Sequence, residues 1–325
     1  MAPFKFIPQL KPVLWGGRRI TQLKHLPGGR EPIGESWEIS AMPGRESVVA
    51  QGDDAGLTLS QLLKKYGKWL VGQSVAEQYG ERFPLLVKII DAHQPLSIQV
   101  HPGDELAAKR HGCAGKTEMW YIVEAQPESV ILAGLNQPLA PAQFETLLLN
   151  GQVEQCVAHY CSAPGDVFFL PPGTIHSIGA GNLLVEIQQA SDITYRLWDY
   201  GRRDDNGLLR QLHLEEAREA INYAPNADIA SHCDTSGTGE TVLASCSHFH
   251  AAHLAVDGHH RLAWVPMRSF LIMVGTQGSL DIVTDSDCHT PLDMGESVLI
   301  PAGVTSIEVT GRGQLVMARM PNKTL

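Results

Sequence analysis

The stretch LSIQVHPGDE, residues 96–105, places Gln99 and His101 two positions apart in an apolar, β-branched run. Side chains alternate between the two faces of a strand, so these two share one face while Ile98 and Val100 share the other. An amide and an imidazole on one surface could be hydrogen-bonding groups in a polar cleft or two ligands of a metal ion. The stretch alone leaves both alternatives open.

A second stretch, GDVFFLPPGTIHS, supplies another histidine at a defined place in a turn. Gly165, Pro171, Gly173 and His176 follow the pattern G-x5-P-x-G-x2-H. A strand that ends at a Pro-Gly turn would project His176 just beyond that turn, into the mouth of a barrel. The pattern matches the second motif of the cupin jelly roll.

Cupins take their remaining metal ligands from a first motif, H-x-H, and from a carboxylate on the next strand. The corresponding positions here are Gln99, His101 and Glu118. Two imidazoles and a carboxylate are a ligand set of catalytic zinc sites, and a glutamine amide oxygen can serve as a fourth ligand. We therefore predict a metal site formed by Gln99, His101, Glu118 and His176. The six cysteines form no C-x-x-C pair, which disfavours a thiolate zinc site.

The elements that must position these residues are mostly short strands separated by glycine and proline, a pattern typical of a barrel or jelly roll. Helical periodicity is confined to residues 57–72, 141–160 and 212–224. Strands are expected in PLLVKIIDA, PLSIQVHP, EMWYIVEA, SVILAGL, DVFFLPPG and NLLVEIQ, and later in FHAAHLAV, RLAWVPM, FLIMVGTQGSLDIV, ESVLIPAG, TSIEVTG and GQLVMARM.

An internal repeat supports a duplicated architecture. GDVFFLPPGTIHS aligns without a gap with GESVLIPAGVTSI, 130 residues further on, and Ser306 falls opposite His176. The sequence thus predicts a mainly β protein with tandem cupin jelly-roll barrels and a few helices. We expect an N-terminal catalytic cupin domain over residues 1–225 with small helical additions, a linker over 226–240, and a C-terminal metal-free cupin-like domain over 241–325. The C-terminal histidines, His248, His250, His253, His259 and His260, lack a matching carboxylate and turn histidine.

The net charge and the composition exclude some classes of binding partner. The net charge of −10, without a basic run, makes nucleic acid and anionic membrane surfaces poor partners. The start lacks the apolar core of a signal peptide and no stretch has the length of a membrane span, so we expect a cytoplasmic protein. We also expect a monomer or a homodimer. An anionic small-molecule substrate would need local cations.

Several further segments carry a resemblance to a known family. KPVLWGGRRI, IGESWEIS, LSIQVHP, GKTEMWYI, PPGTIHSIGAG and ASDITYRLWDYGR occur in an order that resembles mannose-6-phosphate isomerase, type I, in its shorter bacterial form. The likeness runs from about residue 5 to residue 220. Thr117 departs from the proline of long-chain members, and their additional helical domain between Glu118 and His176 has no room here.

The resemblance implies a zinc enzyme, with one ion per chain, that interconverts mannose 6-phosphate and fructose 6-phosphate. It maps the four predicted ligands onto the family's metal ligands. It also maps Arg196 onto the active-site arginine, Lys116 onto the lysine of the K-P-E motif, Glu186 and Asp192 onto acidic residues near the sugar, and Ser97 onto a serine beside the ligands.

Aldose–ketose conversion moves a proton between C2 and C1 through an enediol, so it needs a base, charge stabilisation and a phosphate anchor. Lys116 is the favoured base, with Glu186 and Asp192 as alternatives, and Arg196 suits the enediolate charge. Ser97 and Arg202 are the candidate phosphate contacts. Two other readings remain open: a metal-dependent cupin oxygenase, and a non-catalytic cupin that binds sugar phosphates.

Overall fold

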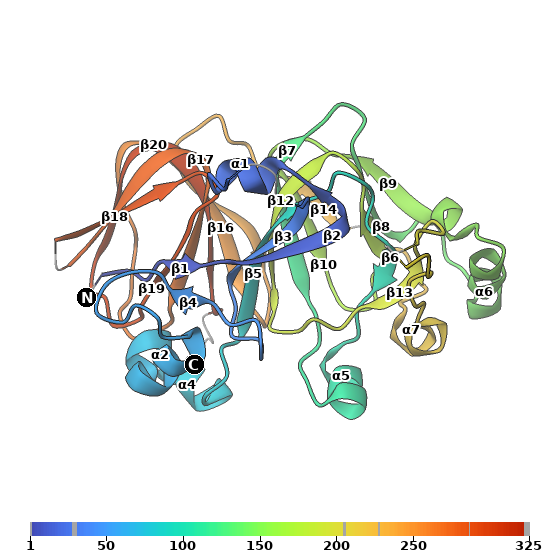
Figure 1. Ribbon diagram of the computed structural model, residues 1–325, viewed down its shortest axis with the longest axis horizontal. Coiled ribbons are helices and arrows are strands. Elements are labelled where there is room, and N and C mark those ends of the chain that lie inside the picture. Colours follow the sequence, from blue (N-terminus) through green and yellow to red (C-terminus); the bar gives the residue numbers. More distant parts are fainter. Residues whose placement is uncertain (1, 28–30, 204–205, 227, 286, 322–325) are drawn as a thin grey trace.

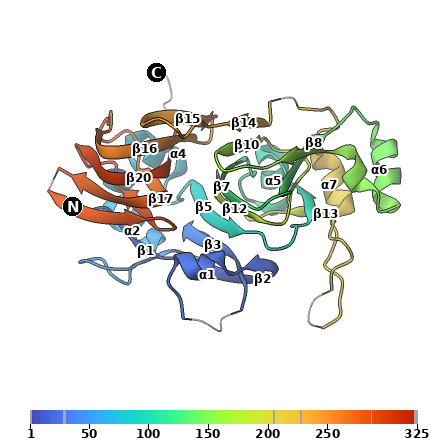
Figure 2. The ribbon, with the colours of Figure 1, turned by 90° about the horizontal axis from the view of Figure 1, so that it is seen from above.

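The computed structural model describes residues 2–27, 31–203, 206–226, 228–285 and 287–321. Figures 1 and 2 show two β-rich halves side by side: the N-terminal half, mostly blue to yellow, and the C-terminal half, orange to red, with the blue helices of residues 59–79 lying against the orange-red strands. Within these ranges, no helix is both long enough and apolar enough to cross a membrane. The predicted mainly β, cupin-like fold with a few helices is confirmed.

The N-terminal half is built from two sheets that enclose a shared core. Its seven-stranded sheet has the order β14-β10-β7-β12-β5-β3-β2 and its five-stranded sheet the order β13-β6-β11-β8-β9. Trp120 and Leu184 from the first sheet pack with Ile131 and Ile178 from the second. The strands are β2 (Gln9–Gly17), β3 (Ile33–Ile39), β5 (Leu85–Asp91), β6 (Ile98–Val100), β7 (Glu118–Ala125), β8 (Val130–Leu135), β9 (Val157–Cys161), β10 (Asp166–Leu170), β11 (His176–Ile178), β12 (Asn182–Gln189), β13 (Tyr195–Trp198) and β14 (Ala230–His232).

The two central strands of the larger sheet explain why its sequence lacks alternation. Every residue of β5 and of β12 is buried, because this sheet is covered on both faces. Lys88 in β5 and Glu186 in β12 lie directly opposite each other in the antiparallel register. Two charged side chains, those of Lys88 and Glu186, therefore belong to fully buried strands of the barrel.

The C-terminal half is a second β-structure with its own apolar interior. Its sheet has the order β15-β16-β20-β17-β18, and β19 also pairs with β17. Its core includes Leu254, Met273, Ile300 and Leu315. The strands are β15 (Gly239–Ser245), β16 (His250–Arg261), β17 (Leu271–Thr284), β18 (Cys288–Asp293), β19 (Ser297–Ile300) and β20 (Ile307–Arg319), and a separate pair is formed by β1 (Phe6–Ile7) and β4 (Val48–Val49).

The helices are shorter than the periodicity predicted. The expected helix 57–72 breaks at Gly67, which has φ +50°, and the expected helix 141–160 ends at Asn150, after which residues 157–161 form a strand. The helices are α1 (Arg19–Leu23), α2 (Leu59–Tyr66), α3 (Lys68–Val71), α4 (Gln73–Tyr79), α5 (Asp104–His111), α6 (Pro141–Leu149) and α7 (Leu214–Ala220), with a 3-10 turn, η1 (Val153–Cys156). The predicted strand RLAWVPM is wrong beyond its first residue, since β16 ends at Arg261.

The two halves share one continuous core and backbone hydrogen bonds. Phe4 exchanges two backbone hydrogen bonds with Leu299, at 2.8 and 2.9 Å. Phe4, Leu70 and Phe83 pack in the same cluster as Phe270. The segment expected to be a linker contains β14, which pairs with β10. The division into residues 1–225 and 241–325 stays a prediction.

The turn Pro301–Gly303, the counterpart of the Pro171–Gly173 turn, receives helix α3 from the N-terminal half. The amides of Ala302 and Gly303 donate to the carbonyls of Leu70 and Trp69, each at 2.9 Å. A Cβ atom on Gly303 would lie 2.0 Å from the indole Nε1 of Trp69. Glycine is required here because another segment approaches the backbone closely.

Replacing Gly303 with alanine is expected to displace Trp69 and to lower the free energy of unfolding by about 1–3 kcal/mol, the usual cost of overpacking. Urea unfolding of the two proteins measures the difference. The matched control is Gly237→Ala, because a Cβ atom there meets no atom within 4 Å. Equal destabilisation by both substitutions would contradict this account of the turn.

Candidate metal centre

Two facing sheets bring the predicted ligands together. β6 and β11 are neighbours in the smaller sheet, where Gln99 lies opposite His176, and His101 follows one residue after β6 ends. Glu118 is the first residue of β7 in the larger sheet. The amide of Gly173 also donates to the carbonyl of His101 at 2.9 Å. This hydrogen bond joins the Pro171–Gly173 turn to the end of β6. Both predicted motifs therefore meet inside one barrel.

Three side chains form a compact, buried group of potential ligands. The ligand atoms of His101, Glu118 and His176 all lie within 4.8 Å of one another. Nε2 of His176 lies 3.2 Å from Nε2 of His101 and 3.2 Å from Oε1 of Glu118. At most 2% of each residue is exposed. Three such electron-rich groups, packed together away from water, require a positive charge between them.

The hydrogen bonds of the two imidazoles fix their tautomers. Nδ1 of His101 lies 2.8 Å from the carbonyl oxygen of Ile193, and Nδ1 of His176 lies 2.8 Å from that of Thr174. A carbonyl only accepts, so each Nδ1 must carry the proton and donate it. Each neutral ring then presents the lone pair of Nε2 to the centre, as metal-ligating histidines do.

The electrostatics keep both rings neutral. Burial, together with the positive charge of Lys116, lowers the pKa of His176 to about 3 and holds the pKa of His101 well below its usual value. Burial also raises the pKa of Glu118 to about 7, although the Lys116 ammonium acts in the opposite direction. Three electron-rich atoms thus converge, and Oε1 of Glu118 has no hydrogen-bond donor. This group fits a first-row divalent cation.

Gln99 lies next to this group. Its Nε2 is 3.3 Å from Nε2 of His176, and its Oε1 accepts a hydrogen bond of 3.3 Å from the hydroxyl of Ser97. Turning the amide over would exchange these two atoms and direct the oxygen at the centre. Gln99 is therefore within reach of the position that a fourth ligand needs.

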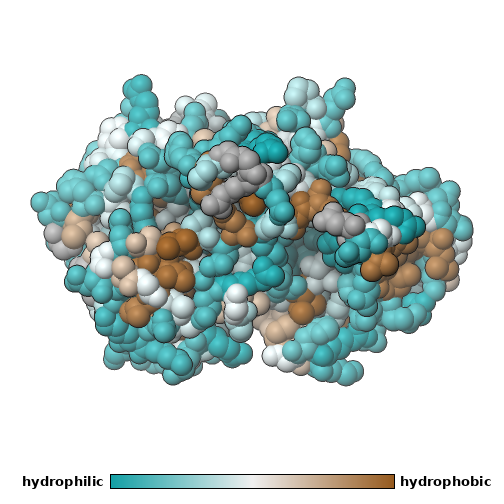
Figure 3. Space-filling view, in the orientation of Figure 1, coloured by the Kyte–Doolittle hydropathy of each residue, from teal (hydrophilic) through white to brown (hydrophobic). Residues whose placement is uncertain are grey.

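A cavity of about 310 Å³ opens beside the ligand group. Figure 3 shows a mostly hydrophilic face with a hollow right of its centre, in the half that holds the N-terminal barrel. Apolar side chains, among them Trp15 and Trp120, form part of the lining. The remaining lining residues are mostly polar or charged: Lys11, Glu35, Lys88, Ser97, Gln99, Lys116, Glu186, Asp192, Thr194, Arg196 and Arg210.

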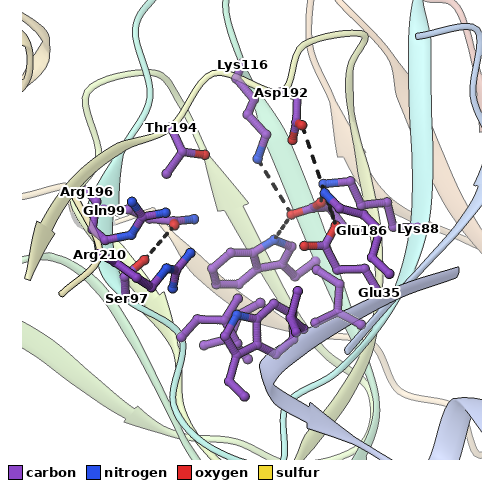
Figure 4. A pocket seen from close by; sticks show the side chains of 17 residues that line it. Glu35, Lys88, Ser97, Gln99, Lys116, Glu186, Asp192, Thr194, Arg196 and Arg210 are labelled. Carbon is purple, nitrogen blue, oxygen red and sulfur yellow. Dashed lines mark hydrogen bonds and ion pairs between the residues drawn. The ribbon is translucent and has the colours of Figure 1, made fainter. Parts of the chain in front are cut away.

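The charged lining has two sides, which Figure 4 shows apart. We call Ser97, Arg196 and Arg210 the arginine side. Nη1 of Arg196 donates to the carbonyl of Gln211 at 2.9 Å, while its buried Nε has no acceptor. Burial and the nearby Arg210 lower the pKa of Arg196, although Asp199 opposes them. The arginine side is therefore positively charged and suited to binding an anion.

The lysine side consists of Glu35, Lys88, Lys116 and Glu186. Nζ of Lys88 lies 2.8 Å from Glu186 and 3.8 Å from Glu35, and Nζ of Lys116 lies 3.9 Å from Glu186. Burial alone would raise the pKa of Glu186, but Lys116 and Lys88 hold it below its usual value. Burial would likewise lower the pKa of Lys88, but Glu186 and Glu35 raise it. These four groups stabilise one another as charges.

The comparisons with known proteins agree with this site. Residues 4–133 match the family model of the phosphomannose isomerase type I catalytic domain. Mannose-6-phosphate isomerase ManA of Bacillus subtilis is 34% identical, over 98% of this chain and 99% of that protein. The chain belongs to the type I mannose-6-phosphate isomerase family. The family consists of aldose–ketose isomerases, and the resemblance read from the sequence is confirmed.

Two further family members show how far the likeness extends. A mannose-6-phosphate isomerase of Streptococcus mutans is 29% identical, over 95% of each chain. The crystal structure of mannose 6-phosphate isomerase from Bacillus subtilis superposes with a TM-score of 0.86 at 30% identity, covering 98% of this chain and 99% of that one. The family fold thus spans both halves of the chain.

Most of the residues that the sequence suggested for this isomerase family line the same cavity. Ser97, Lys116, Glu186 and Arg196 lie on its arginine and lysine sides, and Asp192 lies at its edge with its side chain 45% exposed, 4.0 Å from Nζ of Lys11. Their roles stay predictions. Arg202 does not line the cavity, because its guanidinium donates to the carbonyl of Pro95 at 2.6 Å and pairs with Asp199.

Sequence reasoning missed three cations of this site, Lys11, Lys88 and Arg210. Lys88 is the lone charge within the buried run LLVKII, and such an isolated lysine is a detectable signal. Arg210 reaches the cavity from the segment between β13 and α7, where its Nη1 pairs with Asp199 at 3.3 Å. Nothing in the local sequence distinguishes it from Arg202. Glu35, which the sequence did not single out for the site, also lines the cavity.

The pKa of Glu35 predicts how its contribution to stability depends on pH. Burial alone would raise this pKa, but Lys88 and Lys11 lower it. A carboxyl with a lowered pKa stabilises the fold above its unfolded pKa, and the contribution is lost as the pH falls. We therefore expect Glu35→Gln to cost about 1–3 kcal/mol at pH 7 and progressively less from pH 5 to pH 3.5.

Urea unfolding of both proteins across this pH range measures the difference. Glu308→Gln is the matched control, because the Glu308 side chain is 37% exposed and pairs with His259 on the surface of the C-terminal half. A cost for Glu35→Gln that stays constant with pH would contradict the charge assignment.

Proposed function

We propose that this chain interconverts mannose 6-phosphate and fructose 6-phosphate by proton transfer through an enediol. The observation that supports this proposal is the meeting of two neutral imidazoles and a carboxylate beside a cavity with cations on two sides. A sugar phosphate is anionic at one end and carries vicinal oxygens at the other, so it complements both features.

The proposed metal is zinc, one ion per chain, held by His101, Glu118 and His176 with Gln99 as fourth ligand. The donor set suits zinc, and both histidines already have their Nε2 lone pairs exposed to the centre. Bound zinc would supply Lewis acidity toward the sugar oxygens at C1 and C2. The carbonyls of Ile193 and Thr174 hold the imidazoles in their orientation.

On the arginine side, Ser97 and Arg210 are proposed to bind the phosphate, while Arg196 is assigned to the reacting carbons. Ser97 and Arg202 were suggested by the sequence, and Arg210 adds a guanidinium that lines the cavity itself. Arg202 shares Asp199 with Arg210, so it supports the phosphate site from behind. Guanidinium groups bind phosphate oxygens in a bidentate manner. This placement would direct the other end of the sugar toward Lys116.

Lys116 is the proposed base. With its amine unprotonated, Nζ would take the proton from C2 of the aldose and return it to C1, while a proton moves from the C2 hydroxyl to O1, to give the ketose. Nζ lies 3.1 Å from Nε2 of His101 and contacts Glu118, so it lies beside two of the residues that would hold the metal. Arg196, always cationic, would stabilise the charge of the enediolate.

The two carboxylates suggested as alternatives have weaker geometry for this step. Oε1 of Glu186 accepts a hydrogen bond of 3.0 Å from the indole of Trp120, and its other oxygen pairs with Lys88. Asp192 lies at the exposed edge of the cavity. We propose that Glu186 orients Lys116 and Lys88 by charge, and that Asp192 contacts sugar hydroxyls.

The first test measures conversion of mannose 6-phosphate to fructose 6-phosphate by the purified protein before chelation, after chelation, and after zinc is added back. We expect activity to disappear with the metal and to return with zinc, while magnesium fails to restore it because the site offers imidazole nitrogens. Metal content measured on the same samples is the control. An inactive protein with a full complement of zinc would refute the proposed function.

The second test is Lys116→Met, which removes the amine and keeps an unbranched side chain. Loss of a general base typically costs about 10²–10⁴ in kcat, and we expect KM for mannose 6-phosphate to change much less. Lys109→Met is the matched control, because Lys109 lies exposed on α5. Full activity of the Lys116 variant with zinc bound would rule out the role of base.

A further inference from the structure

The backbone on both sides of Lys116 is held by a hydrogen-bond network that reaches the surface. Oδ1 of Asp104 accepts from the amide of Gly115 at 2.8 Å and from Nε2 of Gln189 at 2.9 Å. Oε1 of Gln189 in turn accepts from the amide of Thr117 at 2.8 Å. The residues before and after Lys116 therefore depend on the same two side chains.

Close packing adds to these bonds. The amide of Lys116 donates to the carbonyl of Pro102 at 3.1 Å, and a Cβ atom on Gly115 would lie 2.6 Å from the amide nitrogen of Asp104. The backbone of Gln189 also donates to the carbonyl of Thr117 at 3.1 Å. The start of α5, seen at the lower edge of the barrel in Figure 1, thus lies directly against the segment that carries Lys116.

The C-terminal half contributes one residue to this network. Nε2 of His248, from the segment between β15 and β16, lies 3.8 Å from Oδ2 of Asp104. The carboxylate of Asp104 therefore faces the catalytic segment with one oxygen and the second β-structure with the other. Burial would raise the pKa of Asp104, but its bonds to Gly115 and Gln189, together with His248, lower it.

We propose that Asp104 and Gln189 are positioning residues that hold Lys116 in its productive place, and that His248 couples this network to the C-terminal half. A lysine side chain has four rotatable bonds, so fixing its Cα is the first condition for placing Nζ to within a fraction of an ångström. The proposal builds on the proposed function, in which Lys116 is the base. It also gives the C-terminal half a part in catalysis without a ligand of its own.

The main test is Asp104→Leu, which removes both acceptor oxygens at a position whose side chain is 55% exposed, so the fold should persist. We expect kcat to fall about 10- to 100-fold, as for a catalytic group misplaced by about 1 Å, with KM and zinc content unchanged. Asp104→Asn keeps an acceptor oxygen and should recover most of kcat. His248→Ala should lower kcat by a smaller factor, and His259→Ala, on the surface of the same half, should not change it.

A second measurement needs no substrate and separates positioning from general loosening. Lysines of the zinc-loaded full chain are acetylated with acetic anhydride, and the labelling rates of Lys116 and Lys88 are compared by peptide mass spectrometry. Both are equally buried, at 4% exposure. We expect Asp104→Leu to raise the ratio of Lys116 to Lys88 labelling several-fold, about fivefold, because only the Lys116 segment loses its restraint.

The outcomes are distinct. An unchanged labelling ratio, a parallel rise at both lysines, a loss confined to KM or zinc content, or failure of Asp104→Asn to recover kcat would each overturn the positioning role. A wild-type protein without isomerase activity would refute the proposed function, while the labelling ratio would still report whether Asp104 holds Lys116.

Discussion

The burial of two imidazoles and a carboxylate with their electron-rich atoms facing one another is the constraint on which the N-terminal half depends. Such a group is unfavourable unless its hydrogens point outward and a cation or ammonium lies within. The fold meets the first condition with two backbone carbonyls, those of Ile193 and Thr174. It meets the second in part with Lys116, whose Nζ contacts Glu118. The strand register, the Pro-Gly turn and the K-x-E segment all serve this arrangement.

A chain of net charge −10 nevertheless builds a cavity suited to an anion. It does so by pairing buried charges locally rather than by its overall field. Lys88 is neutralised by Glu186 and Glu35, whereas Arg196 keeps a buried Nε without an acceptor. The excess positive charge is therefore concentrated on one side of the cavity. Because the site is partly shielded from water, this concentration is felt more strongly there than at the surface.

The mainly β fold and the proximity of His101, Glu118 and His176 could be predicted from the sequence, because both features follow from recognisable local patterns. Strand alternation puts Gln99 and His101 on one face, and the spacing from Pro171 to His176 specifies a turn. Arg210 could not be found in this way, since its position depends on the path of a segment without periodicity. The helix expected over 141–160 failed because Gly151, with φ +69°, follows its end and the apolar residues beyond it belong to a strand. Apolar residues alone do not separate a helix from a strand in so short a run.

The shared core has a consequence for synthesis on the ribosome. Phe4 pairs with Leu299, and α3 docks on the turn Pro301–Gly303, so Phe4 and α3 find these partners only when residue 303 has left the exit tunnel, whereas β2 and β3 pair within the N-terminal sheet. At a translation rate of about 5–20 residues per second, the apolar faces of α2 and α3 stay without these partners for tens of seconds. The N-terminal barrel can close its own sheets in that interval, but its amino-terminal segment cannot. This ordering makes the early segment a natural client for chaperones that shield apolar surface during translation.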